Sequence, residues 1–414
     1  MLTGMVEIHA MPAGWQAEWV VPQYGGFCFS EIPQALPSLF SEPNEAAQRL
    51  LGPLAARYDR VILVFIDGFG RRFFQRYAEQ YPFLRRFLTD GIVTPLTSQF
   101  PSTTAAHVTA IHTGETPGAS GVYEWFVYDP GLDATVSPLT YAFPAGTPGE
   151  LAGTLDPTTL FPPRTMYQRL GERGIASTLF HHRSIATGPA TESLSAGARV
   201  MPFATPKEGI RTLAAAAQDP TASSYLYLYH GAIDTAAHYQ GIHSDRFERE
   251  VARCLMALET ILHRGLHGAR RILLLLTADH GETEITGRIA LDREVRQLPR
   301  WLKGTSRGLP RISGNVRDAV LHVREEDLDE AESELRRALD GRASVFRIDD
   351  LIGAGLFGPS VSDRFRARIG NLMVIPHGRD QIWLESLGFK DFKGLHGGPT
   401  ADEMETQLAA LAYG

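Results

Sequence analysis

Short, largely apolar runs alternate along this sequence with segments of helical periodicity. Runs of this length without polar alternation are typical of strands that are buried on both faces of a sheet. The apolar runs are 61–66, 177–180, 225–229 and 272–276, and the helical patterns are 71–87, 105–112, 165–173, 207–217 and 244–264. We therefore predict an α/β fold with a mostly parallel central sheet and helices on both faces.

The length of 414 residues fits one large α/β domain that carries an insertion. We predict that residues 59–281 and 386–414 form the core of this domain. Residues 1–58, which mix Pro, Gly and aromatic residues, are predicted to be an irregular lead-in packed on the core. Residues 282–385 contain a charged helical pattern, short apolar runs and joints rich in Gly and Pro, and they are predicted to form a smaller inserted α+β cap.

Composition excludes several classes of protein. The net charge is −7, so the sequence has no basic excess of the kind that marks nucleic-acid binding. The two cysteines, Cys28 and Cys254, form no CxxC pair, which suits a reducing compartment. No signal-peptide pattern is present, and no apolar stretch reaches the roughly 18 residues of a membrane span. We expect a soluble cytoplasmic protein, whose oligomeric state the sequence does not indicate.

Acidic and imidazole side chains follow two of the predicted strands. Asp67 comes directly after the run 61–66, and Asp279 and His280 come just after 272–276. Ligands of parallel sheets bind beyond the carboxyl ends of the strands. Asp67 alone could be a loop or capping residue, but an adjacent Asp and His at a buried strand end are costly unless they are paired or bind metal.

Three further segments add candidate residues. Thr103 and Thr104 precede an alanine-rich helix, where a hydroxyl could cap the helix or act as a nucleophile at the positive end of its dipole. Asp234 and His238 lie four residues apart on one helical face, so they could hold one ion or be a cap and a surface histidine. His396 is a loop histidine next to glycine, and it is a candidate ligand because the other segments imply a site that lacks one. Oxygen and nitrogen ligands without thiolate suit two Zn²⁺ ions, with Mn²⁺ as the second choice.

These segments, in this order, resemble the alkaline phosphatase superfamily, and in particular its nucleotide pyrophosphatase/phosphodiesterase branch. The matching pieces are Ile66-Asp67-Gly68, Phe100-Pro101-Ser102-Thr103-Thr104, Asp234-x-x-x-His238, Ala278-Asp279-His280-Gly281 and Leu395-His396-Gly397. The resemblance implies an alkaline-phosphatase-like core with two divalent metal ions. One ion is expected on Asp234, His238 and His396, and the other on Asp67, Asp279, His280 and the nucleophile. Thr104 is the expected nucleophile, because its distance to Thr113-Gly114 matches the family, whereas Thr103 needs a shift of one residue.

The sequence also departs from this family. Family members often carry an asparagine about twenty residues after the nucleophile, and the segment 121–126 contains none. Tyr123 or Trp125 could donate to the phosphoryl group instead, or these aromatic residues could be ordinary packing. Glu124 could repel a doubly charged phosphoryl group, and Arg183 could contact an anion.

The resemblance implies hydrolysis of phosphodiester or nucleotide pyrophosphate bonds through a phosphothreonine intermediate, with a small phosphate ester or nucleotide as substrate. A phosphomonoesterase and a phosphonoacetate-hydrolase-like enzyme remain alternatives within the superfamily. A non-catalytic metal-binding or partner-binding protein is the alternative from another class. The remaining histidines, among them His107 and His112, are predicted to be structural or on the surface, although His107 could face the site.

Overall fold

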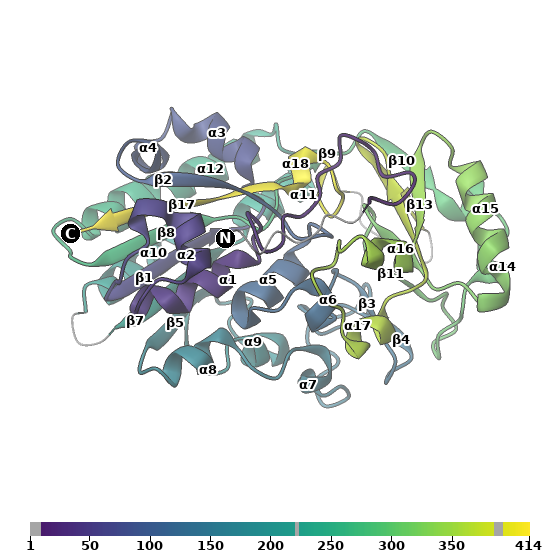
Figure 1. Cartoon of the computed structure of the whole chain (residues 1–414), viewed down its shortest axis with the longest axis horizontal. Helices are drawn as coiled ribbons and strands as arrows, with labels where there is room; N and C mark the ends of the chain where they lie inside the picture. Colours follow the sequence, from purple (N-terminus) through teal and green to yellow (C-terminus); the bar gives the residue numbers. More distant parts are fainter. Residues whose placement is uncertain (1–9, 220–222, 385–391) are drawn as a thin grey trace.

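A computed structural model of the chain describes residues 10–219, 223–384 and 392–414. A seven-stranded sheet has the strand order β2-β17-β8-β1-β7-β5-β6. Its strands are β1 (Arg60–Ile66), β2 (Ile92–Thr97), β5 (Ala176–His182), β6 (Arg199–Phe203), β7 (Ser224–His230), β8 (Ile272–Thr277) and β17 (Glu405–Tyr413). Only β17 runs against its two neighbours in this sheet. The predicted mostly parallel central sheet is confirmed, and it occupies the left half of Figure 1.

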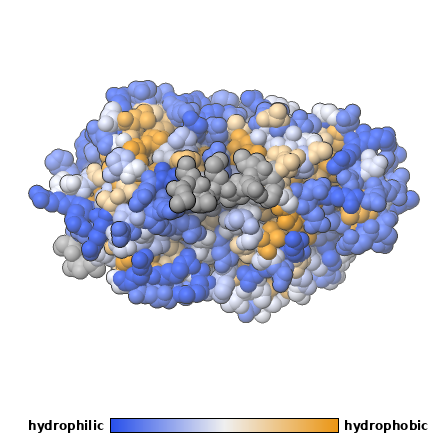
Figure 2. Space-filling view, in the orientation of Figure 1, coloured by the Kyte–Doolittle hydropathy of each residue, from blue (hydrophilic) through white to orange (hydrophobic). Residues whose placement is uncertain are grey.

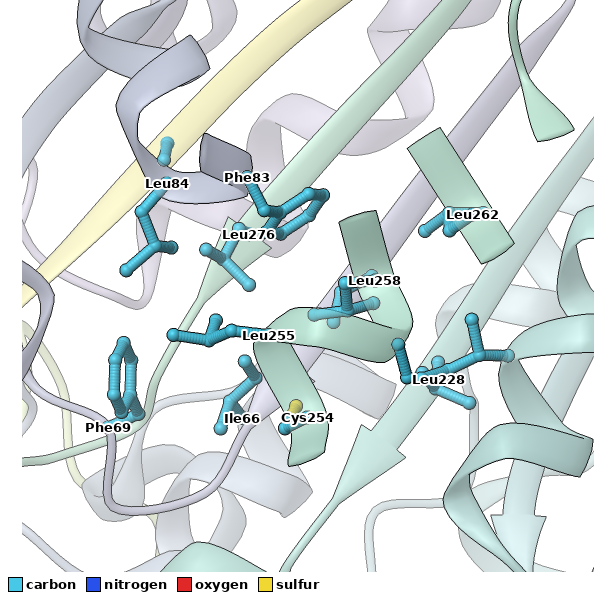
Figure 3. Packing of buried hydrophobic residues seen from close by; sticks show 14 of the residues in the cluster. Ile66, Phe69, Phe83, Leu84, Leu228, Cys254, Leu255, Leu258, Leu262 and Leu276 are labelled. Carbon is cyan, nitrogen blue, oxygen red and sulfur yellow. The ribbon is translucent and has the colours of Figure 1, made fainter. Parts of the chain in front are cut away.

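Both faces of the sheet are covered by helices, so its central strands are apolar on both sides. Ile62, Val64 and Ile66 of β1 belong to one hydrophobic cluster, and the residues between them belong to another. Figure 3 shows the first face, where residues of β1, β7 and β8 meet Phe69, Phe83 and side chains of α12. The first face carries α3 (Arg71–Ala78), α4 (Pro82–Thr89), α10 (Pro206–Ala217), α11 (Ala232–Gln240) and α12 (Asp245–Ala257), and the second carries α1 (Glu31–Ala35), α2 (Glu45–Leu51), α5 (Thr104–Thr113) and α8 (Met166–Gly171).

Two of the predicted helical patterns differ in the structure, and one strand was not predicted. The pattern 71–87 forms two helices rather than one, because Pro82 cannot continue α3 and instead begins α4. The pattern 244–264 forms α12 followed by a π-helical turn at Leu258–His263. The alanine-rich β17 has a composition that favours helix, yet it lies between β2 and β8 as a buried strand.

Residues 287–383 form two smaller sheets, at the right of Figure 1. They are β10–β15 (Gly287–Ala290, Asp380–Trp383) and the antiparallel sheet β11-β12-β14-β13 (Ile312–Ser313, Ala319–Leu321, Leu372–Pro376, Ala343–Arg347) with α15 (Leu328–Ala338). Val122, Tyr123 and Val127 share a hydrophobic cluster with Phe346 and Met373, so the segment after α5 packs on these sheets. The limits of the cap stay a prediction, and the one between 385 and 386, like residues 1–9 of the lead-in, lies outside the described residues.

A buried ion pair joins the smaller sheets to the core. Arg317 donates from Nε to Oε1 of Glu403 at 2.9 Å and from Nη2 to Oε2 at 2.8 Å, and both side chains are fully buried. The same Nη2 donates to the carbonyl of Gly378 at 2.9 Å. Glu403 also accepts from the N–H of Gly398 at 2.9 Å. This pair therefore fixes the loop that carries His396.

The face of the molecule in Figure 2 is largely hydrophilic, with small, separate hydrophobic patches. Single exposed hydrophobic side chains such as Leu88 and Met256 are ordinary on a folded surface. Within the described part of the chain, no helix has the length and apolar character that crossing a bilayer requires.

Candidate metal centre and active site

Neighbouring parallel strands bring the predicted acidic residues to one edge of the sheet. Asp67 follows β1, Asp279 follows β8, and Asp234 lies in α11 directly after β7. Gly68 has a φ of +68°, and its N–H donates to Oδ1 of Asp279 at 3.1 Å. A Cβ at this glycine would stand 3.2 Å from the Cβ of Asp234, so Gly68 allows the aspartates to approach each other.

Asp67, Asp279 and His280 form the first group of possible metal ligands. One ligand atom of each lies within 4.8 Å of the others. Nε2 of His280 is 3.2 Å from Oδ2 of Asp279 and 3.4 Å from Oδ1 of Asp67. Thr104 begins α5, and its Oγ1 lies 3.1 Å from Nε2 of His280 and 3.5 Å from Oδ1 of Asp67. The structure thus brings together the four residues that the resemblance assigns to one ion.

Asp234 is the centre of the second group. Its Oδ1 lies 3.3 Å from Nε2 of His238 and 3.8 Å from Nε2 of His396. Nδ1 of His238 bonds to the carbonyl of Gly394 at 2.8 Å, and Nδ1 of His396 bonds to the carbonyl of Ser102 at 2.9 Å. These carbonyls set the tautomer and direct each Nε2 inward, as the outer partners of metal-binding histidines do. The donor set and its orientation therefore fit a metal ion.

The carboxyl groups of the site are buried and close together, so their charges oppose one another. Burial, followed by the charges of Asp279 and Asp234, raises the pKa of Asp67 well above its ordinary value. Burial disfavours the charge of Asp279, but His280 beside it holds the pKa of Asp279 below its usual range. Burial also lowers the pKa of His396 well below its ordinary value, which keeps the ring neutral as a ligand must be. In the ranges that the structure describes, neither Lys nor Arg forms an ion pair with these carboxylates.

Two residues beside the predicted ligands were not identified as site residues in the sequence. The hydroxyl of Tyr229, in β7, donates to Oδ2 of Asp67. The only sequence signal was the alternation of tyrosines along 225–229, which also suits a packed sheet face. Glu282 is fully buried and belongs to a group of possible ligands with Asp234, His280 and His396. Its signal was its place directly after the segment 278–281.

A cavity of about 1270 Å³ opens over these groups. Thr104 and Asp67 line it, as do Asp234, His238 and His396. Its remaining wall is rich in aromatic and aliphatic side chains, among them Val108, Trp125, Phe126, Leu139, Phe143, Ile185 and Leu194. A cavity of this size admits a substituent much larger than a phosphoryl group.

The predicted substrate contacts divide into two kinds. Trp125 lines the cavity, as one of the two sequence interpretations requires. Tyr123 does not, because its hydroxyl hydrogen-bonds with Oγ of Ser313 at 2.7 Å and its ring packs on Phe365. Glu124 is fully buried outside the cavity wall, and Arg183 is exposed and also outside it. None of these three side chains lines the cavity, and their contacts with a substrate stay predictions.

The histidines near the site also separate into two kinds. His107 is structural, since its Nδ1 bonds to the carbonyl of Thr103 at 2.7 Å and its Nε2 lies 2.8 Å from Oγ of Ser98. His112, His181 and His230 are buried and line the cavity. Burial lowers their pKa values to about 3, 4 and 4, so they present neutral rings to a substrate at neutral pH. The burial of His112 agrees with a structural role, but its place in the cavity wall was not predicted.

Glu124 gives a pH-dependent prediction. Burial raises its pKa from 4.5 to about 8, so the folded protein binds this proton more tightly than the unfolded chain does. Its contribution to stability is complete below about pH 4.5 and is lost as the pH rises through about 8. We expect Glu124→Gln, which stays neutral, to lose less thermal stability than the wild type between about pH 5 and 9. Melting curves measure this, with the exposed Glu79→Gln as control; equal losses in all three proteins would contradict it.

Comparison with known proteins agrees with this geometry. The family described as Type I phosphodiesterase / nucleotide pyrophosphatase matches residues 61–399. Human ectonucleotide pyrophosphatase / phosphodiesterase 5 has a similar structure, with a TM-score of 0.64, 16% sequence identity, and 85% of this chain and 87% of that chain covered. Its murine counterpart has a TM-score of 0.60 and 16% sequence identity, with 85% of this chain and 88% of that chain covered.

An inactive threonine-to-alanine variant of the murine protein, in complex with AMP, gives a TM-score of 0.60, 16% identity and coverages of 85% and 87%. At these identities the structural likeness shows the fold alone. No curated protein matches the sequence. The family match spans all the residues of the two metal-ligand groups and Thr104, and the chain therefore belongs to the type I phosphodiesterase / nucleotide pyrophosphatase family of hydrolases.

Proposed function

We propose that the protein hydrolyses phosphodiester or nucleotide pyrophosphate bonds, with Thr104 as nucleophile and two divalent cations as cofactors. The observation that carries the proposal is the position of Thr104. Its hydroxyl stands at the first turn of α5, beside Asp67 and His280, and it lines the large cavity. The murine relative that is inactive as a threonine-to-alanine variant supports a threonine nucleophile.

Charge balance supports two ions rather than one. Asp67, Asp234, Asp279 and Glu282 are four carboxyl groups that are buried or nearly so. When ionised they carry four negative charges, which two divalent cations offset. Zn²⁺ suits the mixed imidazole and carboxylate ligands, and Mn²⁺ is the second choice. Asp234, His238 and His396 would hold one ion, and Asp67, Asp279, His280 and Thr104 the other.

The proposed reaction consists of two displacements at phosphorus, with Thr104 as the attacking group in the first. Oγ1 of Thr104 attacks phosphorus, its bond to phosphorus forms, and the bond to the leaving oxygen breaks. Water then attacks the phosphothreonine and the Thr104 oxygen leaves, so two in-line displacements retain configuration at phosphorus. The free N–H groups of the first turn of α5 face the developing negative charge. The ions, when bound, supply positive charge that lowers the pKa of the attacking hydroxyl and offsets charge on the phosphoryl group.

The size of the cavity favours a diester over a small monoester. A second substituent on phosphorus has about 1270 Å³ available, next to Trp125 and Phe126. Aromatic rings of this kind contact flat or apolar groups well. A nucleotide ester or an aryl phosphodiester therefore fits the site better than a bare phosphoryl group does.

The test is a substrate panel with purified protein. We expect hydrolysis of bis-p-nitrophenyl phosphate and of a nucleotide p-nitrophenyl ester, loss of both activities with a chelator, and recovery with Zn²⁺ or Mn²⁺. Faster turnover of p-nitrophenyl phosphate would indicate a phosphomonoesterase, and turnover of phosphonoacetate alone would indicate a phosphonate hydrolase. Bound metal without turnover of any ester in the panel would contradict the proposal and favour a non-catalytic binding protein.

A further inference from the structure

Glu282 is placed beside the Asp234 group by a strand pairing between distant parts of the chain. β9 (Thr283–Glu284) pairs antiparallel with β16 (Gly394–Leu395), and Thr283 lies opposite Leu395. Glu282 and His396 come just beyond the end of this ladder, next to Thr283 and Leu395, so the pairing brings their backbones close together. A carboxylate oxygen of Glu282 lies within 4.8 Å of the ligand atoms of Asp234, His280 and His396.

Within residues 10–219, 223–384 and 392–414, no hydrogen-bond partner of the Glu282 carboxylate explains its burial. The residue is 0% exposed, and neither of its carboxylate oxygens takes part in a hydrogen bond with a described residue. Oδ1 of Asp234 is also without a hydrogen bond. The nearby Arg72 donates to the backbone carbonyl of Glu282 at 2.6 Å and pairs with Asp402 rather than with this carboxylate. Buried carboxylates of this kind need a cation or a shared proton.

The backbone around Glu282 leaves room for its side chain. A Cβ at Gly394 would stand 3.2 Å from Oε2 of Glu282 and 2.8 Å from the carbonyl of Ala237. The carbonyl of this same glycine orients His238. Gly394 therefore brings two side chains, Glu282 and His238, towards the space between Asp234 and His396.

We propose that the carboxylate of Glu282 is a further ligand of the divalent cation held by Asp234, His238 and His396, an inference that rests on the proposed function. Four protein ligands and one substrate oxygen require at least five-fold coordination. A second carboxylate also makes the donor set harder. A set of one Asp and two His suits tetrahedral Zn²⁺. The additional ligand and the second carboxylate both shift the preference towards Mn²⁺.

The test compares Glu282→Gln and Glu282→Asp with the wild type. Glutamine keeps the size and the hydrogen-bonding capacity of the side chain but removes its charge. Glu259→Gln is the control, because Glu259 is also largely buried and pairs with Arg86 far from the ligand groups. Calorimetric titration of metal-free protein with Mn²⁺ and with Zn²⁺, together with elemental analysis, gives the affinity and number of ions.

We expect Glu282→Gln to lower the affinity for one of the two ions by at least about tenfold, and to leave the affinity for the other ion unchanged. The loss of affinity should be larger for Mn²⁺ than for Zn²⁺. Glu282→Asp keeps the charge, so its metal affinity should lie between those of the wild type and Glu282→Gln. Unchanged affinity for both ions in Glu282→Gln would overturn the inference. Glutamine can take the place of a protonated carboxyl group that shares its proton with Asp234, but it cannot take the place of an anionic ligand.

Thermal melting separates the ligand role from a structural role. Without metal, Glu282→Gln should melt at a higher temperature than the wild type, because an amide stays neutral beside Asp234, whereas a buried carboxyl must either carry a charge or take up a proton. Its gain in melting temperature on addition of Mn²⁺ should be smaller. A lower melting temperature without metal, together with an undiminished response to Mn²⁺, would show a structural role and overturn the inference.

The outcomes for this inference and for the proposed function are distinguishable. Two bound ions in the wild type, one of them weakened in Glu282→Gln, with no hydrolysis of any ester, would support Glu282 as a ligand and contradict the proposed function. Phosphodiester hydrolysis by the wild type with unchanged metal affinity in Glu282→Gln would contradict the role of Glu282 alone.

Discussion

Replacement of Thr104 by alanine is expected to lower kcat/KM for a phosphodiester by roughly 10³-fold or more, because loss of a nucleophile removes the covalent route. The Thr104 hydroxyl lies within 3.5 Å of both Asp67 and His280, so its environment is built around that oxygen. Serine at this position keeps the hydroxyl, and Thr104→Ser should retain much more activity than Thr104→Ala. Steady-state kinetics with bis-p-nitrophenyl phosphate measures both variants.

Thr103 provides the matched control for this experiment. It directly precedes α5 without a side-chain capping hydrogen bond, is fully buried, and does not line the cavity. Thr103→Val keeps the shape of the side chain and should leave kcat/KM close to the wild-type value. A large loss in Thr103→Val with little change in Thr104→Ala would show that the nucleophile is Thr103 instead.

Replacement of Arg317 by methionine is expected to lower the free energy of unfolding by about 3–5 kcal/mol, since removal of one partner leaves the other as an uncompensated buried charge. Glu403 is that partner, and it also accepts from Gly398 next to the His396 loop. Urea unfolding monitored by circular dichroism measures the change. Because the same loop carries a predicted ligand, we also expect weaker binding of metal by the folded variant.

A surface ion pair is the control for Arg317. Arg337 and Glu334 form a similar bidentate contact on α15, but both side chains are in contact with solvent. Arg337→Met should leave the unfolding midpoint nearly unchanged. A similar small effect in Arg317→Met would show that the buried pair does not join the smaller sheets to the core as strongly as its geometry indicates.

The elements that the sequence predicted well are those with strong local signals. Short, largely apolar runs identified β1, β5, β7 and β8, because such runs are typical of strands covered on both faces. β2, β6 and β17 were missed, since their residues are mixed or alanine-rich. β17 becomes a strand because it completes hydrogen bonding between β2 and β8, which is a property of the sheet rather than of the segment.

Some residues of the site were also predictable from local signals in the sequence, and others were not. Asp67, Asp279 and His280 were predictable because they follow buried strands, and parallel strands end at one edge of the sheet. Tyr229 was not predictable as a site residue, since Tyr225 and Tyr227 have the same pattern, yet Tyr225 lies in the core and Tyr227 lies in both the core and the cavity wall. Which tyrosine meets Asp67 depends on the strand register, where Tyr229 pairs with Phe65 near the end of β1.

The sequence by itself therefore determined the class of fold, the order of the ligand segments and the chemistry that oxygen and nitrogen donors can support. These follow from local periodicity and from residue types, which need no knowledge of distant contacts. The tertiary structure alone decided that Glu282 lies close to His396, that Arg317 pairs with Glu403, and that Tyr123 lies in the core rather than in the cavity. Each of these depends on pairing between residues far apart in the chain, and such pairings leave no periodic trace in the sequence.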